Sequence, residues 1–244
     1  MDAQLSVAQR IFRFAARFEP IAWLSFPARM LLRGYGRYLP AWLASLRPAM
    51  AQRSPQPWLV FSATEYLETF PLAGKQVFEY GSGASTQYWL RRRARVISIE
   101  HDAAWYQQVR RRIPAAAGLD YRFVAPEPDS ADAPPRDPAE PADCVSAHYP
   151  QDRLRYSAYV AQIDALPDRS LDLVLVDGRA RAACLVRAAP KVRPGGLLIL
   201  DNSDRGYYTA RVGAALSRYE ALIFRGPAPQ APIFSQTTIY RCIA

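Results

Sequence analysis

A glycine-rich turn in the first half of the chain has the residue types and spacing of a ligand-binding loop. It lies in the segment Val77-Phe-Glu-Tyr-Gly-Ser-Gly-Ala-Ser-Thr86, where an apolar run ends in the pattern Glu79-x-Gly81-x-Gly83, with Ser82 between the glycines. The pattern predicts a buried strand, a tight turn and then a helix. Glycines let the backbone pass close to a ligand, and the start of a helix offers unpaired N–H donors. The turn therefore suits a phosphate or a carboxylate group.

Two common nucleotide-binding motifs do not fit this turn. A dinucleotide fingerprint would have a third glycine at the position of Thr86, and the Gly-Lys-Ser/Thr of a P-loop is absent. Glu79 at the end of the strand would repel a pyrophosphate, but it suits a ligand with an ammonium group. A methionine-like group carries both a carboxylate and an ammonium, so it is compatible with the whole pattern.

A second acidic residue follows at the spacing of a nucleoside-binding site. The predicted strand Arg95–Glu100 ends on Glu100, nineteen residues after Gly81. A carboxylate at this place can accept two hydrogen bonds from ribose hydroxyls. Alone, Glu100 would be an ordinary surface acid, but together with the glycine turn it indicates a ligand site. His101 comes next, and we expect it to lie near an adenosine rather than to act as a catalytic base.

Two further apolar runs end on acidic residues. Leu171–Asp177 and Leu197–Asp201 have the character of strands that are buried on both faces. Asp177 and Asp201, followed by Asn202, are therefore expected at the carboxyl edge of the sheet, where ligands bind in open α/β sheets. Arg179 and Arg181 could bind an anionic acceptor there. The alternative is that both arginines are solvated at the start of a helix.

Taken in order, these motifs resemble the class I S-adenosylmethionine-dependent methyltransferases. The resemblance covers about residues 58–244 and depends on several motifs at their proper spacing: Glu79-x-Gly81-x-Gly83, Glu100, Asp177 and the turn Arg193-Pro-Gly-Gly196. Three phrases look like a bacterial subgroup of this superfamily, to which we attach no defined substrate: Glu79-Tyr-Gly-Ser-Gly-Ala-Ser-Thr86, Val176-Asp-Gly-Arg-Ala-Arg181 and Asp201-Asn-Ser-Asp-Arg205.

The resemblance implies a role for each matching residue. Gly81, Ser82 and Gly83 would lie against the methionine part of the cofactor, and Glu79 would hold its ammonium group, directly or through water. Glu100 would hold the ribose hydroxyls. Asp177 would border both the sulfonium and the methyl acceptor, so Asp177 and Arg179 are the candidates for a catalytic role.

Some small-molecule O-methyltransferases also bind a divalent metal, with an aspartate after the fourth strand and an Asp-Asn pair after the fifth. Asp177, Asp201 and Asn202 are the candidates here, and an all-oxygen set of ligands suits Mg²⁺. Those enzymes carry a basic lysine where this chain has Ala180. We therefore do not favour a metal. The alternative is that Asp201 and Asn202 cap the loop after the strand.

The predicted elements alternate along most of the chain. Strands are predicted over 77–80, 95–100, 121–124, 171–177, 197–201, 219–224 and 237–242, and helices over 62–70, 84–94, 103–112, 155–166 and 180–190. This alternation predicts a doubly wound, Rossmann-like α/β fold with a mostly parallel sheet of seven strands. The proline-rich loop 226–232 leaves no room for a crossover helix, so the last strand is expected to be antiparallel.

The chain divides into two predicted parts: a basic, amphipathic helical extension with a proline-rich linker over 1–57, and the methyltransferase domain over 58–244. In the extension, an apolar stripe of Val7, Ile11, Phe14 and Phe18 stands beside a basic stripe. Residues 1–47 could pack on the domain, lie on an anionic membrane surface, or act as a transit peptide. Their uncharged runs are shorter than the ~20 residues that a membrane span needs.

Residues 126–152 interrupt the alternation of strands and helices. They contain seven prolines and show no periodicity. We interpret them as a solvated acidic insertion or as a lid over a substrate pocket.

The net charge of +9 does not by itself indicate nucleic-acid binding. Residues 1–50 carry a net charge of +5, whereas residues 114–152 carry −6. Because the charge is uneven, nucleic acid is not an expected partner. The three cysteines, at 144, 184 and 242, form neither a disulfide framework nor a zinc-site pattern. A cytoplasmic location is expected, with peripheral membrane contact as an option.

We therefore expect methyl transfer from S-adenosylmethionine to a small molecule, at oxygen, with an anionic acceptor as one option. The alternatives are a non-catalytic cofactor-binding scaffold and an RNA methyltransferase. A dehydrogenase is disfavoured by Thr86 and Glu79.

Overall fold

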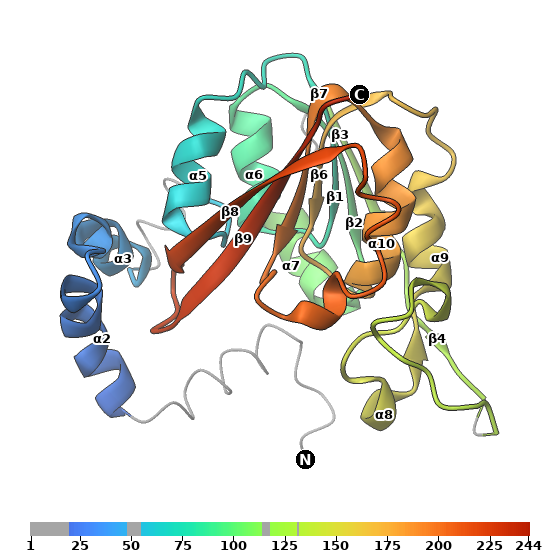
Figure 1. Ribbon diagram of the computed structural model, residues 1–244, viewed down its shortest axis with the longest axis horizontal. Coiled ribbons are helices and arrows are strands. Elements are labelled where there is room, and N and C mark those ends of the chain that lie inside the picture. Colours follow the sequence, from blue (N-terminus) through green and yellow to red (C-terminus); the bar gives the residue numbers. More distant parts are fainter. Residues whose placement is uncertain (1–19, 48–54, 114–117, 131) are drawn as a thin grey trace.

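The computed structural model describes residues 20–47, 55–113, 118–130 and 132–244. Its centre is a seven-stranded sheet in the order β3-β2-β1-β6-β7-β9-β8 (Figure 1). The strands are β1 Gln76–Tyr80, β2 Arg95–Glu100, β3 Leu119–Phe123, β6 Leu171–Val176, β7 Val192–Asp201, β8 Tyr219–Pro227 and β9 Phe234–Cys242. Only β9 runs against the others in this sheet. The predicted Rossmann-like fold with an antiparallel last strand is confirmed.

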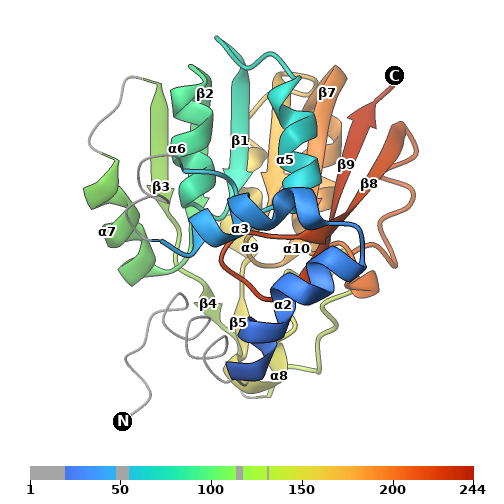
Figure 2. The same ribbon diagram turned by 90° about the vertical axis from the view of Figure 1, so that its left-hand side faces the viewer.

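Helices cover both faces of the sheet (Figures 1 and 2). On one face α5 (Phe61–Glu68) and α6 (Ala84–Arg91) pack with Val77 of β1. On the other face α10 (Arg181–Ala188) packs with Phe78 and Tyr80. This division follows from the alternation of side chains along a strand. At the β3 edge, α7 (Ala103–Arg112) places the ring of Tyr106 4.4 Å from that of Tyr121.

The helix predicted over 155–166 is wrong in extent. The structure has a four-residue helix, α9 (Ser157–Val160), followed by the 3₁₀ turn η3 (Ala161–Ile163). Tyr159, Val160 and Ile163 are nevertheless all buried. The apolar spacing therefore predicted correctly that these residues are buried against α10. A short α turn and a 3₁₀ turn bury them without a regular helix.

The predicted insertion carries a small sheet of its own. Strands β4 (Glu127–Pro128) and β5 (Leu154–Arg155) pair antiparallel, with the 3₁₀ turn η2 (Pro141–Asp143) and α8 (Tyr149–Asp152) between them. Some of its acidic residues are paired within the insertion: the carboxylate of Asp129 accepts hydrogen bonds from Arg136 and, at 2.6 Å, from the Tyr149 hydroxyl. Others pair outside it, since Asp137 and Glu140 form salt bridges with Arg211 at 3.1 and 3.0 Å. The acids thus stabilise the loop and also connect it to the rest of the domain.

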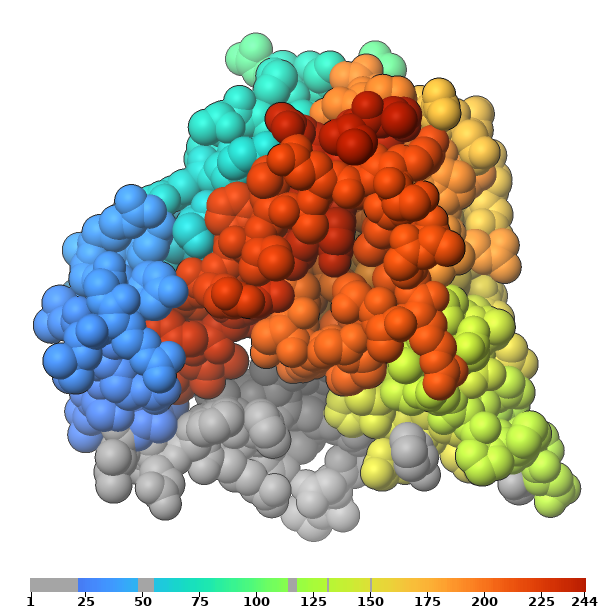
Figure 3. All heavy atoms as spheres, viewed as in Figure 1, coloured from blue at the N-terminus to red at the C-terminus, as the bar shows by residue number. Residues whose placement is uncertain are grey.

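The described part of the N-terminal extension packs on the β8–β9 hairpin. It comprises α2 (Pro20–Leu32), the 3₁₀ turn η1 (Gly36–Tyr38) and α3 (Leu39–Ser45). Phe26 of α2 and Trp42 of α3 are buried, and the ring of Phe26 lies 5.0 Å from that of Phe234. Figure 3 shows the extension, in blue, lying against the hairpin, in red. The stripe of Val7, Ile11, Phe14 and Phe18 falls outside the described residues.

None of the helices in the described ranges is both long and apolar enough to cross a bilayer.

The packing of the extension predicts the effect of two neighbouring substitutions. Trp42 is 2% exposed and its indole N–H donates to the carbonyl oxygen of Ala231 at 2.9 Å, whereas Leu43 is 47% exposed. We expect Trp42→Ala to lower the free energy of unfolding by about 3–5 kcal/mol and Leu43→Ala by less than about 1 kcal/mol. Urea unfolding of both variants measures the difference. An equal loss of unfolding free energy in the two variants would mean that the packing of Trp42 on the hairpin does not contribute to the stability of the domain.

Candidate functional site

The glycine turn after β1 is fixed by a close approach of two main-chain segments. Gly81 has φ +93°, and a Cβ atom there would lie 3.0 Å from the Cα of Gly178. The N–H of Gly81 donates to the carbonyl oxygen of Ile99 at 2.9 Å, and that of Asp177 donates to the carbonyl oxygen of Tyr80 at 3.0 Å. The ends of β1, β2 and β6 therefore meet at one point. Any side chain at Gly81 would be strained by its φ and would collide with Gly178.

Glu79 lies beneath this turn, with no exposed surface. One carboxylate oxygen accepts from the hydroxyls of Thr86 and, at 2.7 Å, Ser98, and the other accepts from the indole N–H of Trp89 at 3.1 Å. Thr86 in turn accepts from the N–H of Gly83 at 3.0 Å. In this structure Glu79 anchors the turn to the start of α6. Its predicted contact with an ammonium group stays a prediction.

Burial raises the pKa of Glu79 to about 7, although the hydrogen bonds from Thr86, Ser98 and Trp89 act in the opposite direction. The carboxyl is consequently protonated in mildly acidic solution, where an ordinary glutamate is ionised.

Glu100 and Ser82 are joined directly across the site. One oxygen of the Glu100 carboxylate accepts from the Ser82 N–H at 3.0 Å and from the Ser82 hydroxyl at 2.9 Å. The other oxygen accepts from the N–H groups of His101 and Asp102 at 2.8 and 2.9 Å. Burial alone would raise the pKa of Glu100, but the bonds from His101, Asp102 and Ser82 outweigh it and lower the pKa. The site therefore holds a carboxylate, not a carboxylic acid.

Sequence reasoning missed the aromatic residues that complete this part of the site. The Tyr121 hydroxyl lies 2.7 Å from the Ser82 hydroxyl, and the Trp105 indole N–H donates to the Ser82 carbonyl oxygen at 2.8 Å. A signal for Trp105 was present: Asp102 caps α7, and its carboxylate accepts from the Trp105 N–H at 2.8 Å. The first turn of a helix that starts directly after Glu100 must lie beside the glycine turn.

Arg179 connects both histidines of the chain. Its Nε donates to Nε2 of His101 at 3.3 Å, and its Nη1 lies 3.1 Å from Nδ1 of His148. Because an arginine can only donate, these imidazole nitrogens face Arg179 as acceptors. The other ring nitrogen of His101, Nδ1, lies 3.0 Å from the Glu100 carboxylate. His148 belongs to the insertion, so Arg179 connects the insertion to the glycine turn.

Arg181 is buried between the two aspartates of the carboxyl edge. It is 8% exposed and donates to the Asp177 carboxylate at 2.9 Å, to the Gly178 carbonyl oxygen at 3.0 Å and to the carbonyl oxygen of Asp201. These bonds occupy its guanidinium, so the predicted option of an anionic acceptor bound by Arg181 does not agree with the structure. Arg181 instead stabilises the junction of β6, β7 and α10.

The carboxyl groups next to Arg181 have raised pKa values. Burial, followed by the charge of nearby Asp177, raises the pKa of Asp201 to about 7, against the attraction of Arg181. Burial also raises the pKa of Asp177, and Arg181 opposes this shift. The Asp177 side chain remains 28% exposed, so it is the one of the two that a ligand can reach.

The residues at this edge do not fit a divalent metal. Asp201 is 4% exposed, and its two carboxylate oxygens accept from Thr237 at 2.7 Å and from the Asn202 amide at 2.8 Å. Asn202 thus presents its N–H₂ group, not its oxygen, toward Asp201. Arg181 already places a positive charge between Asp177 and Asp201. Among the described residues no group of three or more His, Cys, Asp or Glu is arranged to hold a metal.

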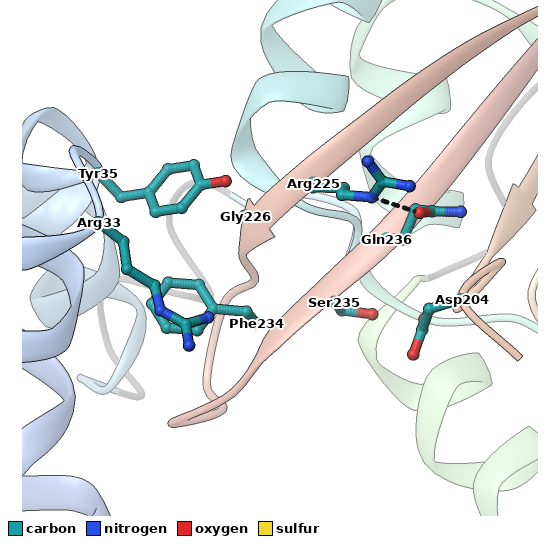
Figure 4. Close-up of a pocket in the computed structure, with 8 residues that line it drawn as sticks. All are labelled: Arg33, Tyr35, Asp204, Arg225, Gly226, Phe234, Ser235 and Gln236. Carbon is teal, nitrogen blue, oxygen red and sulfur yellow. Dashed lines mark hydrogen bonds between the residues drawn. The ribbon is translucent and has the colours of Figure 1, made fainter.

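A hollow of about 450 Å³ opens beside this edge, between the extension and the hairpin (Figure 4). Its lining residues come from the end of α2, from the loop after β7 and from both hairpin strands: Arg33, Tyr35, Asp204, Arg225, Gly226, Phe234, Ser235 and Gln236. The Ser235 hydroxyl accepts from the Asn202 amide at 3.2 Å, which places the hollow next to the end of β7. Its volume is in the range of small-molecule sites.

The raised pKa of Glu79 predicts a pH dependence of stability. The folded protein binds a proton at Glu79 that the unfolded chain releases above its ordinary pKa near 4.5, so stability falls as pH rises from about 4.5 to about 7. We expect Glu79→Gln, which preserves the shape of the side chain but replaces one acceptor oxygen with an N–H₂ group, to flatten this fall by on the order of 3 kcal/mol. Urea unfolding at pH 5 and pH 8 is the measurement. Glu220→Gln, at a half-exposed carboxylate of β8, is the control, and a Glu79→Gln curve parallel to the wild type would contradict the assignment.

The position of Arg181 predicts a large effect for one arginine of α10 and a small effect for another. Arg181→Met leaves Asp177 and Asp201 without their buried cation, and we expect it to cost about 3–5 kcal/mol. Arg187→Met removes a cation whose side chain is 56% exposed and which pairs with Asp164 at 3.1 Å, and it should cost less than about 1 kcal/mol. Thermal and urea unfolding compare the two, and a similar cost for both would show that Arg181 is not required for the junction.

Comparison with known proteins finds similarity at the level of structure. No family profile matches the sequence, and no curated protein is similar to it. A protein of Klebsiella pneumoniae assigned as an O-methyltransferase superimposes with a TM-score of 0.54 at 16% identity, over 84% of this chain and 90% of that one. The O-methyltransferase TomG from Streptomyces achromogenes, in complex with S-adenosylmethionine, superimposes with a TM-score of 0.49 at 13% identity, over 96% of this chain and 95% of that one. An O-methyltransferase from Bacillus cereus superimposes with a TM-score of 0.48 at 14% identity, over 89% of this chain and 90% of that one. By its strand order and by the first of these superpositions, the chain has the fold of the class I S-adenosylmethionine-dependent methyltransferases.

Proposed function

We propose that the protein binds S-adenosylmethionine at the glycine turn and transfers its methyl group to an oxygen of a small molecule. The observation that carries the proposal is the joining of three strand ends, which sets Ser82, Glu100 and Asp177 around one point at the carboxyl edge. The fold supports the cofactor, and the assignment of the Klebsiella pneumoniae protein as an O-methyltransferase supports oxygen as the acceptor atom.

The residues present fit this cofactor. Glu100 is a carboxylate whose present partner, the Ser82 hydroxyl, can be exchanged for a ribose hydroxyl without leaving an unpaired charge. The Tyr159 hydroxyl is buried without a hydrogen-bond partner among the described residues, and a Cβ atom at Gly178 would lie 2.0 Å from it. The absence of a side chain at Gly178 therefore lets the main chain beside Asp177 come close to this buried hydroxyl. Bound at the glycine turn, the cofactor would supply an activated methyl group on its sulfonium.

Transfer is an in-line displacement, so the protein contributes mainly alignment and exclusion of water. A hydroxyl acceptor also has to lose its proton. His101 and His148 are poorly placed to accept it, because Arg179 donates to a nitrogen of each ring. Asp177 is the better candidate: it is partly exposed, it borders the turn, and its raised pKa makes it a stronger base than an ordinary aspartate. Arg179 then serves to hold the insertion over the site.

The hollow next to Asn202 supports a small and anionic acceptor. Arg33 and Arg225 bring two positive charges to its lining, and the ring of Phe234 provides an apolar wall. The guanidinium of Arg225 donates to Gln236 at 2.8 Å through its Nε. In this arrangement its Nη groups remain directed away from that bond, where an acceptor carboxylate or phosphate could approach them.

Arg91, Arg92 and Arg93 stand together at the end of α6, and of these Arg92 gives no support to an RNA acceptor. Arg92 is occupied by the main chain: it donates to the carbonyl oxygens of Leu67 at 2.7 Å, Glu68 at 3.2 Å and Phe70 at 2.8 Å. Arg92 thus fixes the end of α5 to that of α6 rather than presenting a charge to a phosphate.

Isothermal titration with S-adenosylhomocysteine, with NAD as the comparison ligand, tests the proposal. We expect binding in the micromolar range for S-adenosylhomocysteine and none for NAD. Glu100→Ala should weaken binding by about 100-fold, since it removes charge-assisted hydrogen bonds. Glu220→Ala, at a half-exposed carboxylate far along the sheet, is the control. A folded protein that binds neither ligand would overturn the proposal in favour of a structural role for the turn.

Turnover distinguishes an enzyme from a non-catalytic scaffold. With methyl-labelled cofactor and a panel of phenols that carry a carboxylate, we expect transfer by the wild type and a loss of about 100-fold or more in kcat for Asp177→Asn. Binding of S-adenosylhomocysteine should change little in that variant. Cofactor binding without transfer to any member of a broad acceptor panel would favour the scaffold.

A further inference from the structure

The α2–α3 extension has an inner side that is buried and an outer side that is not. Phe26, Met30 and Trp42 pack inward on the hairpin. Five leucines remain exposed, and we call them the leucine face: Leu24 at 81%, Leu31 at 60% and Leu32 at 87% on α2, and Leu43 at 47% and Leu46 at 37% on α3. Figure 2 shows both helices on the outside of the molecule, in front of the sheet.

The leucines of α2 are arranged for contact with one surface. Leu24, Leu31 and Leu32 are spaced by seven and eight residues, which puts them within one arc of the helix, opposite Phe26 and Met30. Exposed leucines scattered singly are ordinary, but a cluster on one helical face marks a site of contact with another apolar phase.

The charge around the leucine face has one sign. Between residues 20 and 64 the sequence contains no aspartate or glutamate, while it contains five arginines: Arg29, Arg33, Arg37, Arg47 and Arg53. Arg37 pairs with Glu65 at 2.7 Å. Arg29, Arg33 and Arg47 are exposed and form no salt bridge with any carboxylate in the described ranges. The guanidinium groups of Arg29 and Arg33 lie 5.5 and 4.7 Å from the centre of the Phe234 ring, on the hairpin side of α2. Arg47, which follows the exposed Leu46, is therefore the cation that we assign to contact with an anionic surface.

We propose that the leucine face docks the protein on the surface of an anionic lipid bilayer. In this position α2 lies in the plane of the interface, its leucines enter the boundary of the acyl chains, and Arg47 contacts lipid phosphates. The helix has 13 residues, so it lies on the bilayer and does not cross it. An acidic partner protein would satisfy the arginines but would not require such a continuous leucine surface. The proposal is independent of the proposed methyl transfer.

Vesicle sedimentation of the full-length chain tests the docking. We expect binding to phosphatidylcholine vesicles that contain phosphatidylglycerol, weak binding to pure phosphatidylcholine, and a loss of binding as salt is raised. The double variant Leu24→Ser/Leu32→Ser should bind at least about tenfold more weakly, because each buried leucine contributes enough hydrophobic free energy for such a change. The matched control is Ile223→Ser/Ile243→Ser, at positions 55% and 62% exposed outside the extension. It should bind like the wild type.

A pair of charge variants separates local contact from net charge. Arg47→Gln and Arg95→Gln change the net charge equally, and both positions are exposed, but only Arg47 belongs to the extension. We expect about fivefold weaker binding for Arg47→Gln and little change for Arg95→Gln. Unaltered circular dichroism and an unaltered urea unfolding curve would show that the variants are folded.

Three results would overturn the proposal. The first is no binding of the wild type to anionic vesicles, as expected if residues 1–19 cover the leucine face. The second is a dimer in sedimentation analysis that the leucine double variant dissociates while vesicle binding is absent. The third is equal loss of binding in the leucine variant and in its isoleucine control, which would indicate nonspecific adsorption.

Discussion

The contact between Gly81 and Gly178 is the constraint on which the rest of the site depends. At this point the main chain after β1 meets the main chain after β6 so closely that a Cβ atom on either residue would collide with the other strand or with Tyr159. The contact brings Glu100, at the end of the neighbouring β2, and Asp177 to opposite sides of one turn. A sheet with looser strand ends would place these carboxylates too far apart to address one ligand. Gly81 is thus required by distance as well as by its φ, and Gly178 by distance alone.

A second consequence of this tight junction is that its charges must be balanced internally. Asp177 and Asp201 end adjacent buried strands, and two carboxylates in such surroundings repel each other and lose solvation. The guanidinium of Arg181 compensates for both effects and also satisfies carbonyl oxygens of both loops. Its planar group of donors can serve several acceptors at once, which a lysine or a hydrated metal ion at this place could not do in the same geometry. The arginine therefore gives the edge its shape and leaves only Asp177 accessible.

Sequence patterns predicted the strands and the strand-end acids because both depend on local chemistry. In a chain of alternating strands and helices, an apolar run followed by an acid is most stable as a buried strand with the acid at its carboxyl end. Glu100 and Asp177 lie at the carboxyl ends of β2 and β6, as predicted. Patterns could not predict which arginine is buried, because Arg179 and Arg181 are only two residues apart. Arg181 begins α10, whereas Arg179 precedes the helix and is separated from it by Ala180, whose φ is +48°. The contact of His148 with Arg179 was equally unpredictable from the sequence. The two residues are 31 positions apart, and the path of the insertion between them depends on its own ion pairs. The helix predicted over 155–166 is wrong in extent for a similar reason, since burial alone does not decide between an α-helix and shorter turns.

The extension shows why an apolar helix can have two partners. α2 is apolar around most of its circumference, so its sequence is compatible both with packing on the domain and with a surface role. The structure assigns Phe26 and Met30 to the hairpin, and that assignment leaves Leu24, Leu31 and Leu32 on the outside. Packing on the domain and the proposed contact with a membrane therefore involve different sides of α2, and they do not compete. Because the hairpin that receives α2 also lines the hollow beside Asn202, whatever holds the outer side of the helix is connected mechanically to that hollow.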